Sequence, residues 1–436
     1  MLTGPKSDQN KRSLSSPQIP IFNSTNILNT SFKSTRRLHA FRLNTLLTLL
    51  TAASIGMSAN LYASAASPSQ DKKHTAQKGK TPILKKAAAK SKPVANKSTP
   101  SENVHYLEWQ EVQNFIEKMH LQHQFDRAQL SAIFDQTRYI ESVVQLIKPM
   151  PAGKPKNWKV YRSRFVENAR IEAGLAFWER NVDCLNRAEN LYGVPAEIIV
   201  GLIGVETIYG KQTGNFRAID ALTTLAFSYP ETPTKEARMA FFQKELSELL
   251  LWTRESAIDI FSIKGSYAGA LGLAQFMPSS LRQYALDFDN DGKINLKESE
   301  ADAIGSVAHY LAVHGWKKNI PYAFPATLDI DRVNEKSKEK TSEKTDEKQL
   351  ALFLGQGLKA TYLLDDLRPL VSTSDEQAPR TIKYGLVDLQ NGENPTEYWL
   401  GTENFFAITQ YNRSYFYAMS VIDLGRVIGL ARRKND

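Results

Sequence analysis

Apolar residues recur at helical spacing, every three to four positions, along most of the chain beyond its first quarter. The stretches Glu108–Phe134, Asn168–Tyr192 and Ala196–Tyr209 have this spacing, and Tyr415–Ala431 closes the chain in the same way. Pro195 stands immediately before the third stretch, where a proline costs little because the first N–H groups of a helix have no intrahelical partner. The pattern predicts a fold built mainly from helices.

Between Pro321 and Phe406 the pattern changes to short runs rich in β-branched and aromatic residues, which are typical of strands. The runs read ATLDIDRV, TIKYGLVDLQ and EYWLGTENFFAITQY. The charged run EKSKEKTSEKTDEK interrupts them at 335–348 and predicts a solvated loop. We therefore expect an α+β fold that is predominantly α, with a small β-containing segment at about 321–406.

Positive charge is concentrated at the N-terminus. Residues 1–65 carry a net charge of +6 and residues 66–104 carry +7, which leaves the other 332 residues at −4 within the total of +9. A nucleic-acid-binding domain would need its Lys and Arg residues clustered on the folded surface. The charge distribution therefore argues against nucleic acid as a partner.

Two N-terminal segments precede the expected folded region at 105–436. Within 1–65, the apolar stretch Leu43–Ala59 follows three arginines and precedes an A-x-A site. This is the pattern of a secretory signal or, given the long basic flank, of an uncleaved anchor. No cysteine follows closely, which excludes bacterial lipid attachment there. Residues 66–104 have almost no large apolar side chain and predict a flexible basic linker, whose lysines could contact anionic envelope polymers.

Glu206 is the most unusual residue of the helical region. It lies in AEIIVGLIGVETIYG, whose apolar side chains go almost all the way round a helix, so we expect that helix to be buried. Glu197 stands nine residues earlier and therefore on the opposite face. Glu206 then meets a distant cation, lines a cleft, or stays protonated with a raised pKa. A neutral carboxylic acid suits a general acid, and a Glu that bridges core elements is an equally good interpretation.

A second catalytic carboxylate is not evident near Glu206. Most glycosidases use two carboxylates that flank the sugar bond. Asp220 follows in NFRAIDALTT, where we predict it to be the N-cap of the next helix. One acid without a partner favours a reaction in which the substrate supplies its own nucleophile.

The segment 265–298 combines two signals. Its first part, GSYAGALGLAQFMPSS, is rich in small residues and favours close approach to the backbone. Its second part, Asp287–Glu298, fills a twelve-residue calcium loop of the EF-hand type, for which a plain Asp/Asn/Gly turn is the alternative. The predicted ligands, in loop order, are Asp287, Asp289, Asp291, the backbone carbonyl of Lys293, Asn295 and Glu298.

Four motifs together resemble the lytic murein transglycosylase B family: GVPAEIIVGLIGVETIYG, KGSYAGALGLAQFMPSS, ADAIGSVAHYLAVHGW and NFFAITQYNRSYFYAMSV. They occur in the family's order between roughly Val160 and Leu430. The resemblance implies a lysozyme-like core with an α-rich domain and a small β-containing domain. It also implies a monomeric periplasmic enzyme, without an organic cofactor. Such an enzyme cleaves the β-1,4 bond between N-acetylmuramic acid and N-acetylglucosamine in peptidoglycan and forms a 1,6-anhydro sugar without consuming water.

The family's functional residues carry over only where the motifs match. Glu206 falls on the single catalytic acid, which protonates the glycosidic oxygen and then accepts the proton of the muramyl C6 hydroxyl. Asp302 falls on the carboxylate that closes the family's calcium site, so either Glu298 or Asp302 could close it here. Arg238 falls on one of two adjacent arginines, and Ala237 replaces the other. The remaining matches are sugar-contacting positions: Ser266, Gln275, Tyr310, Tyr411, Asn412, Tyr417 and, less closely, Tyr161.

Two other functions stay open at this point. A muramidase-type hydrolase would need a carboxylate placed to activate water. A non-catalytic peptidoglycan-binding scaffold would have no use for an acid buried in an apolar helix. In the catalytic interpretation, we expect Glu206 to lie in one groove between the 265–275 strip and the segment Tyr411–Tyr417.

Overall fold

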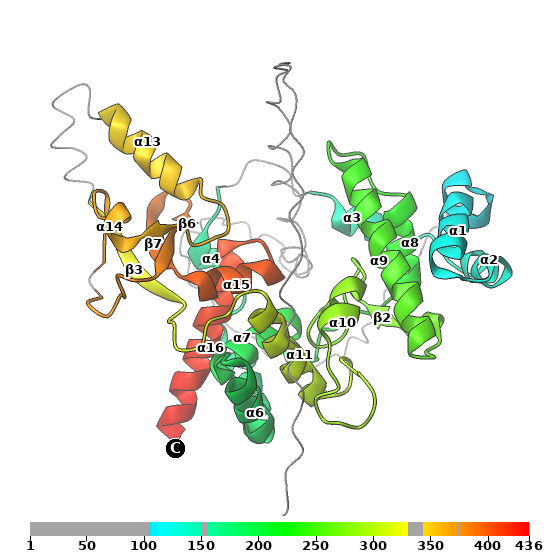
Figure 1. Cartoon of the computed structure of the whole chain (residues 1–436), viewed down its shortest axis with the longest axis horizontal. Helices are drawn as coiled ribbons and strands as arrows, with labels where there is room; N and C mark the ends of the chain where they lie inside the picture. Colours follow the sequence, from blue (N-terminus) through cyan, green and yellow to red (C-terminus); the bar gives the residue numbers. More distant parts are fainter. Residues whose placement is uncertain (1–103, 150–154, 330–342, 374, 436) are drawn as a thin grey trace, which may run out of the picture. The chain divides into compact units, whose positions relative to one another are not determined.

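The computed structural model describes residues 104–149, 155–329, 343–373 and 375–435 (Figure 1). The predicted signal or anchor at 1–65 lies outside this part of the chain, as does the predicted linker apart from Val104. The folded region is mainly helical and carries two antiparallel sheets, which confirms an α+β fold that is predominantly α. The smaller sheet pairs β1 (Phe216–Arg217) with β2 (Lys264–Gly265), and the larger sheet has five strands.

Helix α7 (Ala196–Thr207) is the centre of the core. All of its residues are buried except Glu197 and Glu206, as the apolar pattern predicted. The C-terminal helix α16 (Tyr415–Asn435) crosses it so closely that glycines are required at the contact. A Cβ atom on Gly201 would lie 2.3 Å from the carbonyl oxygen of Val421. The crossing therefore fixes the C-terminal end of the chain against the helix that carries Glu206.

The other helices of this core are shorter than the sequence pattern predicted. The stretch 168–192 divides into α5 (Asn168–Arg180) and α6 (Val182–Tyr192) at Asn181. The stretch 108–134 likewise divides, because Gln124 ends the first helix with φ of 56°. Around them lie η1 (Tyr106–Glu108), α1 (Gln110–His123), α2 (Arg127–Asp135), α3 (Glu141–Ile147), α4 (Trp158–Arg162), α8 (Ala218–Phe227), α9 (Lys235–Glu255), η2 (Ile260–Ser262), α10 (Pro278–Tyr284) and α11 (Glu300–Val313).

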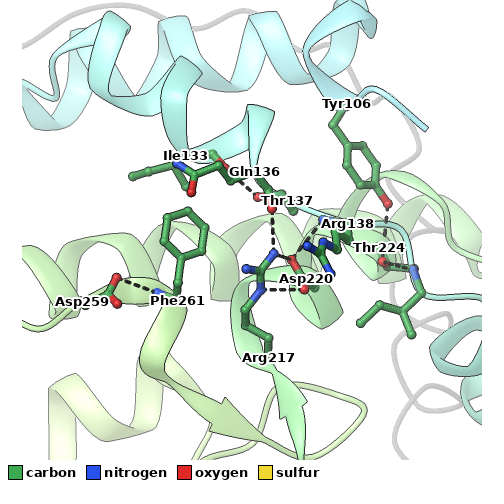
Figure 2. A network of polar contacts seen from close by, with 11 residues as sticks. Tyr106, Ile133, Gln136, Thr137, Arg138, Arg217, Asp220, Thr224, Asp259 and Phe261 are labelled. Carbon is green, nitrogen blue, oxygen red and sulfur yellow. Dashed lines mark hydrogen bonds and ion pairs between the residues drawn. The ribbon is translucent and has the colours of Figure 1, made fainter. Parts of the chain in front are cut away.

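Asp220 does not cap α8, and that prediction was wrong. Arg217 is the N-cap, and Asp220 lies buried inside the first turn. Its carboxylate accepts from the Arg217 guanidinium at 2.7 Å and from the backbone N–H of Arg138 at 3.0 Å (Figure 2). The same guanidinium donates to the carbonyl of Gln136 at 2.6 Å. Asp220 therefore joins α8 to the α2–α3 connection instead of accepting hydrogen bonds from the N–H groups of its own helix.

The larger sheet has the strand order β4-β6-β7-β3-β5, and every neighbouring pair is antiparallel. Helices α13 (Glu343–Leu354) and α14 (Leu364–Leu367) lie beside the strands (Figure 1). They contribute Phe353, Leu364 and Leu367 to a separate hydrophobic cluster with the strands. The strands are β3 (Ala323–Leu328), β4 (Tyr362–Leu363), β5 (Val371–Ser372), β6 (Lys383–Asn391) and β7 (Asn394–Gly401).

Two predictions for this region need correction. The third run was predicted to be all strand, but β7 ends at Gly401 and α15 (Glu403–Tyr411) follows. The Thr402 hydroxyl accepts from the backbone N–H of Asn404 at 3.2 Å and starts that helix. The charged run was predicted to be a loop, but its last six residues belong to α13, and its first part lies outside the described residues.

No single helix in the described ranges is long and apolar enough to cross a membrane. The bent pair formed by α6 and α7 has the length and the apolar composition of a membrane span.

Candidate active site

Glu206 occupies the last turn of α7, where its side chain is half-buried. The Tyr417 hydroxyl from α16 donates to Glu206 Oε1 at 2.5 Å. Burial raises the pKa of Glu206 to about 7, while the hydrogen bond from Tyr417 opposes that rise because it favours the charged form. No carboxylate of the described residues contributes to this shift. Glu206 is therefore a carboxyl group that can carry or release a proton near neutral pH.

Aromatic residues predicted to contact sugars gather around this carboxyl group. The rings of Tyr411 and Tyr417 stack with centroids 6.4 Å apart. Tyr310 contacts Tyr411 edge to face at 4.9 Å and donates its hydroxyl to the carbonyl of Gln410 at 2.9 Å. Burial raises the pKa of Tyr161, Tyr411 and Tyr417, and the charge of Glu206 raises it further. Tyr417 is fully buried, and its hydroxyl is occupied by the hydrogen bond to Glu206.

The strip 265–275 lies against both α7 and α15. The Thr207 hydroxyl donates to the carbonyl of Leu273 at 3.0 Å, and the Tyr411 hydroxyl donates to the carbonyl of Ala274. Gln275 follows with φ of 49°, in the left-handed region, and its amide donates to the carbonyls of Gly272 at 2.9 Å and Thr213 at 3.2 Å. These contacts bring the Gln275 end of the strip to the Glu206 site.

The other three predicted binding residues lie in different surroundings. Ser266 is buried at the start of the strip, where its hydroxyl accepts from the N–H of Ala270 at 3.0 Å. Asn412 is half-buried at the end of α15, next to Tyr411. Arg238 is buried in α9, with its guanidinium over the rings of Tyr229, Phe241 and Phe242.

Three of the predicted metal ligands come together in the acidic loop 287–302. One carboxylate oxygen each of Asp287, Asp289 and Asp302 lies within 4.8 Å of the others. Asp302 is fully buried at the start of α11 and accepts from the N–H groups of Phe288 at 2.7 Å and Asn295 at 2.8 Å. Such a set of hard oxygen ligands fits calcium.

The carboxylates of Asp291 and Glu298 are not part of this cluster. Glu298 is 71% exposed and pairs with Lys297 at 3.5 Å. The Asp291 carboxylate accepts from the N–H of Lys293 at 2.8 Å, and the Asn295 side chain accepts from the N–H of Glu298 at 3.1 Å. The geometry therefore favours Asp302 over Glu298 as the closing carboxylate.

Thr207, which follows Glu206 directly, was not predicted from the sequence. A polar residue at the end of an otherwise apolar helix was a visible signal, but its partner lies 66 residues away. The direct bond from Tyr417 to Glu206 was also missed, because it joins residues 211 positions apart.

Comparison with known proteins agrees with this geometry. Residues 108–426 match the family model for the transglycosylase SLT domain. The chain is 40% identical over 329 residues to membrane-bound lytic murein transglycosylase B of Escherichia coli K12, covering 73% of this chain and 83% of that protein. It is also similar to soluble lytic transglycosylase SltB1 from Pseudomonas aeruginosa, with 40% identity, a TM-score of 0.64 and coverage of 74% and 99%.

A third relative, Escherichia coli lytic transglycosylase Slt35, was solved in complex with calcium. It shows 39% identity and a TM-score of 0.62, and the match covers 74% of this chain and 94% of that one. The family model, the sequence comparison and the structure comparison all identify lytic transglycosylases. Their members share a lysozyme-like helical fold with a small sheet. The chain therefore belongs to the transglycosylase SLT domain family, the lytic murein transglycosylases.

Proposed function

We propose that this enzyme cleaves the β-1,4 bond between N-acetylmuramic acid and N-acetylglucosamine in peptidoglycan, with Glu206 as its only acid and base. The observation that carries the proposal is the position of Glu206 at the end of the buried helix α7, where Tyr417 bonds its carboxyl group and burial raises its pKa to about 7. A general acid works best when its pKa lies near the working pH. A water-activating hydrolase would use a second carboxylate.

The reaction then needs one group in two protonation states. Protonated Glu206 gives its proton to the glycosidic oxygen, and the bond from that oxygen to the muramyl C1 breaks. The Glu206 carboxylate next takes the proton of the C6 hydroxyl, whose oxygen forms a new bond to C1. The proton is thereby returned to Glu206, and the product is a 1,6-anhydro sugar with no water consumed. The Tyr417 hydroxyl supports the charged state between the two steps.

The glycan contacts are proposed for the residues around this acid. The Tyr411 hydroxyl donates to the carbonyl of Ala274, next to Gln275. The strip therefore meets the aromatic wall, formed by Tyr310, Tyr411 and Tyr417, beside Glu206. Glycines let a backbone approach a ligand closely, and amides orient N-acetyl groups. The proposed contacts are Ser266, Gln275, Tyr310, Tyr411, Asn412, Tyr161 and Arg238.

A structural calcium ion is proposed for the acidic loop, held by Asp287, Asp289 and Asp302. The clustered carboxylates support it, as does the calcium complex of the similar Slt35. Calcium would offset the repulsion among three carboxylates and take no part in the chemistry.

We also propose a periplasmic location, since murein is the substrate and residues 1–65 have the pattern of a signal or anchor.

Product analysis tests the reaction. Digestion of purified peptidoglycan should give muropeptides with anhydro ends, about one water lighter by mass than hydrolysed ends. Glu206→Gln should lose at least about 100-fold in rate. Glu197→Gln is the matched control, because Glu197 lies on the same helix and accepts from Tyr322 instead. Hydrolysed ends, or full activity in a folded Glu206→Gln variant, would contradict the proposal.

A further inference from the structure

Thr207 is fully buried, so its hydroxyl cannot touch a substrate. That hydroxyl nevertheless acts both as a hydrogen-bond donor and as an acceptor. It donates to the carbonyl of Leu273 at 3.0 Å and accepts from the backbone N–H of Gly210 at 3.1 Å. A second acceptor in its own helix, the carbonyl of Ile203, lies farther away at 3.3 Å. The group immediately after Glu206 therefore joins the catalytic helix to a separate segment.

The chain leaves α7 in a conformation that must be held from outside. Ile208, Tyr209 and Gly210 follow one another with φ of 50°, 55° and 89°. The left-handed region is unfavourable for residues other than glycine, and above all for a β-branched isoleucine. The bonds from Gly210 to the Thr207 hydroxyl and from Gln212 to the Thr207 carbonyl at 2.9 Å close this turn. Thr207 thus fixes the backbone directly after Glu206.

Leu273, the acceptor, is anchored from its other side. Its N–H donates to the carbonyl of Leu296 at 2.7 Å. The contact leaves no space for a side chain at Gly272, where a Cβ atom would lie 2.4 Å from the same oxygen. Leu296 belongs to the acidic loop, in which the N–H of Asn295 donates to Asp302 at 2.8 Å. The backbone of Leu273 is therefore held in place by Leu296, and the end of α7 is hydrogen-bonded to it through Thr207.

We propose that Thr207 is a positioning residue whose hydroxyl sets the distance between Glu206 and the Leu273–Gln275 part of the strip. Residues 273 and 274 accept from Thr207 and Tyr411 in turn, so the strip is held between the acid and the aromatic wall. Alignment of the acid with the sugar oxygen depends on that distance, since a small displacement of a catalytic group costs rate more than binding. This inference rests on the proposed role of Glu206 and assigns a further residue to it.

Two substitutions separate the hydroxyl from the shape of the side chain. Thr207→Val keeps the shape and removes the hydroxyl, whereas Thr207→Ser keeps the hydroxyl. Kinetics on purified peptidoglycan should show kcat lowered about tenfold in Thr207→Val, with KM changed by less than about twofold. The pH at which kcat/KM falls should also move, because Glu206 loses its fixed place against Tyr417. Thr207→Ser should stay within about threefold of the wild type at every pH.

Wild-type kcat and pH profile in Thr207→Val would overturn the inference, as would equal damage in Thr207→Ser. If Thr207→Val does not fold, hydrogen exchange in the wild type decides the question. The Gly210 amide should be strongly protected there, and exchange at the rate of an exposed amide would contradict the hydroxyl bond. Hydrolysed product in the wild type, or activity in Glu206→Gln, would instead refute the function of Glu206.

Discussion

Tyr417 donates its hydroxyl to Glu206 at 2.5 Å across the crossing of α16 and α7. The two helices meet where glycines allow direct backbone contact, with a Cβ on Gly425 reaching within 2.1 Å of the Glu197 carbonyl. The acid therefore takes its hydrogen-bond partner from the C-terminal helix, and the packing of the core fixes their separation. Burial and this one bond set the protonation of the site.

Tyr417→Phe should raise the pKa of Glu206 further, because it removes the bond that favours the charged form. Glu206 must be protonated to act first as an acid, so the pH above which kcat/KM falls should move upward by up to about one unit. The rate below that pH should drop, since the carboxylate of the second step loses its support. A pH profile of kcat/KM measures both effects.

Tyr415→Phe is the matched control for that experiment. Tyr415 lies on the same helix, but its hydroxyl donates to the carbonyl of Gly357 at 3.0 Å. Its pH profile should match that of the wild type. An unchanged profile in Tyr417→Phe would show that the hydroxyl does not act on Glu206.

Glu206→Gln should be more stable than the wild type at alkaline pH. Burial raises the folded-state pKa from 4.5 to about 7, so the native state binds more protons than the unfolded state between these values. Wild-type stability therefore falls as pH rises through this window. The gain for Glu206→Gln should be on the order of 2–3 kcal/mol at pH 8 and should vanish below about pH 4.5. Urea unfolding at several pH values tests this, and a gain independent of pH would contradict the assigned pKa.

Calcium should stabilise the fold through Asp302 and not through Glu298. At about 100 times its Kd, calcium should add roughly 2.7 kcal/mol to the free energy of unfolding. Asp302→Asn should abolish this increase, because Asp302 is the buried member of the carboxylate cluster. Glu298→Gln should retain it, since that side chain faces solvent. The melting temperatures of both variants with calcium and with chelator test this. Loss of the calcium effect in Glu298→Gln and not in Asp302→Asn would place the closing ligand at Glu298.

Asp220→Asn should weaken the junction between α8 and the α2–α3 connection. It leaves the Arg217 guanidinium without its carboxylate, at a cost of about 2 kcal/mol in the free energy of unfolding. Asp126→Asn is the control, because Asp126 caps α2 through Gln129 at 2.7 Å and asparagine caps equally well. Denaturant midpoints compare the two, and equal midpoints would mean that the network adds no stability.

Features that depend on neighbours along the chain could be predicted from the residues alone. The all-apolar surroundings of Glu206 predicted a buried helix, and the spacing of Asp287 and Asp289 predicted an acidic loop, because both patterns act within a few turns. The sequence also predicted that Glu206 would be a buried acid, and burial raises its pKa to about 7.

Which distant group each polar atom meets depends on the packing of the folded chain. That packing placed Asp302, and not Glu298, beside Asp287 and Asp289, made Asp220 a junction instead of a cap, and made the end of the third predicted strand a helix. It also brought Tyr417 and Leu273 to the end of α7. A buried donor or acceptor must find a partner wherever the packing places one, and that partner's position along the chain leaves no periodic trace in the sequence.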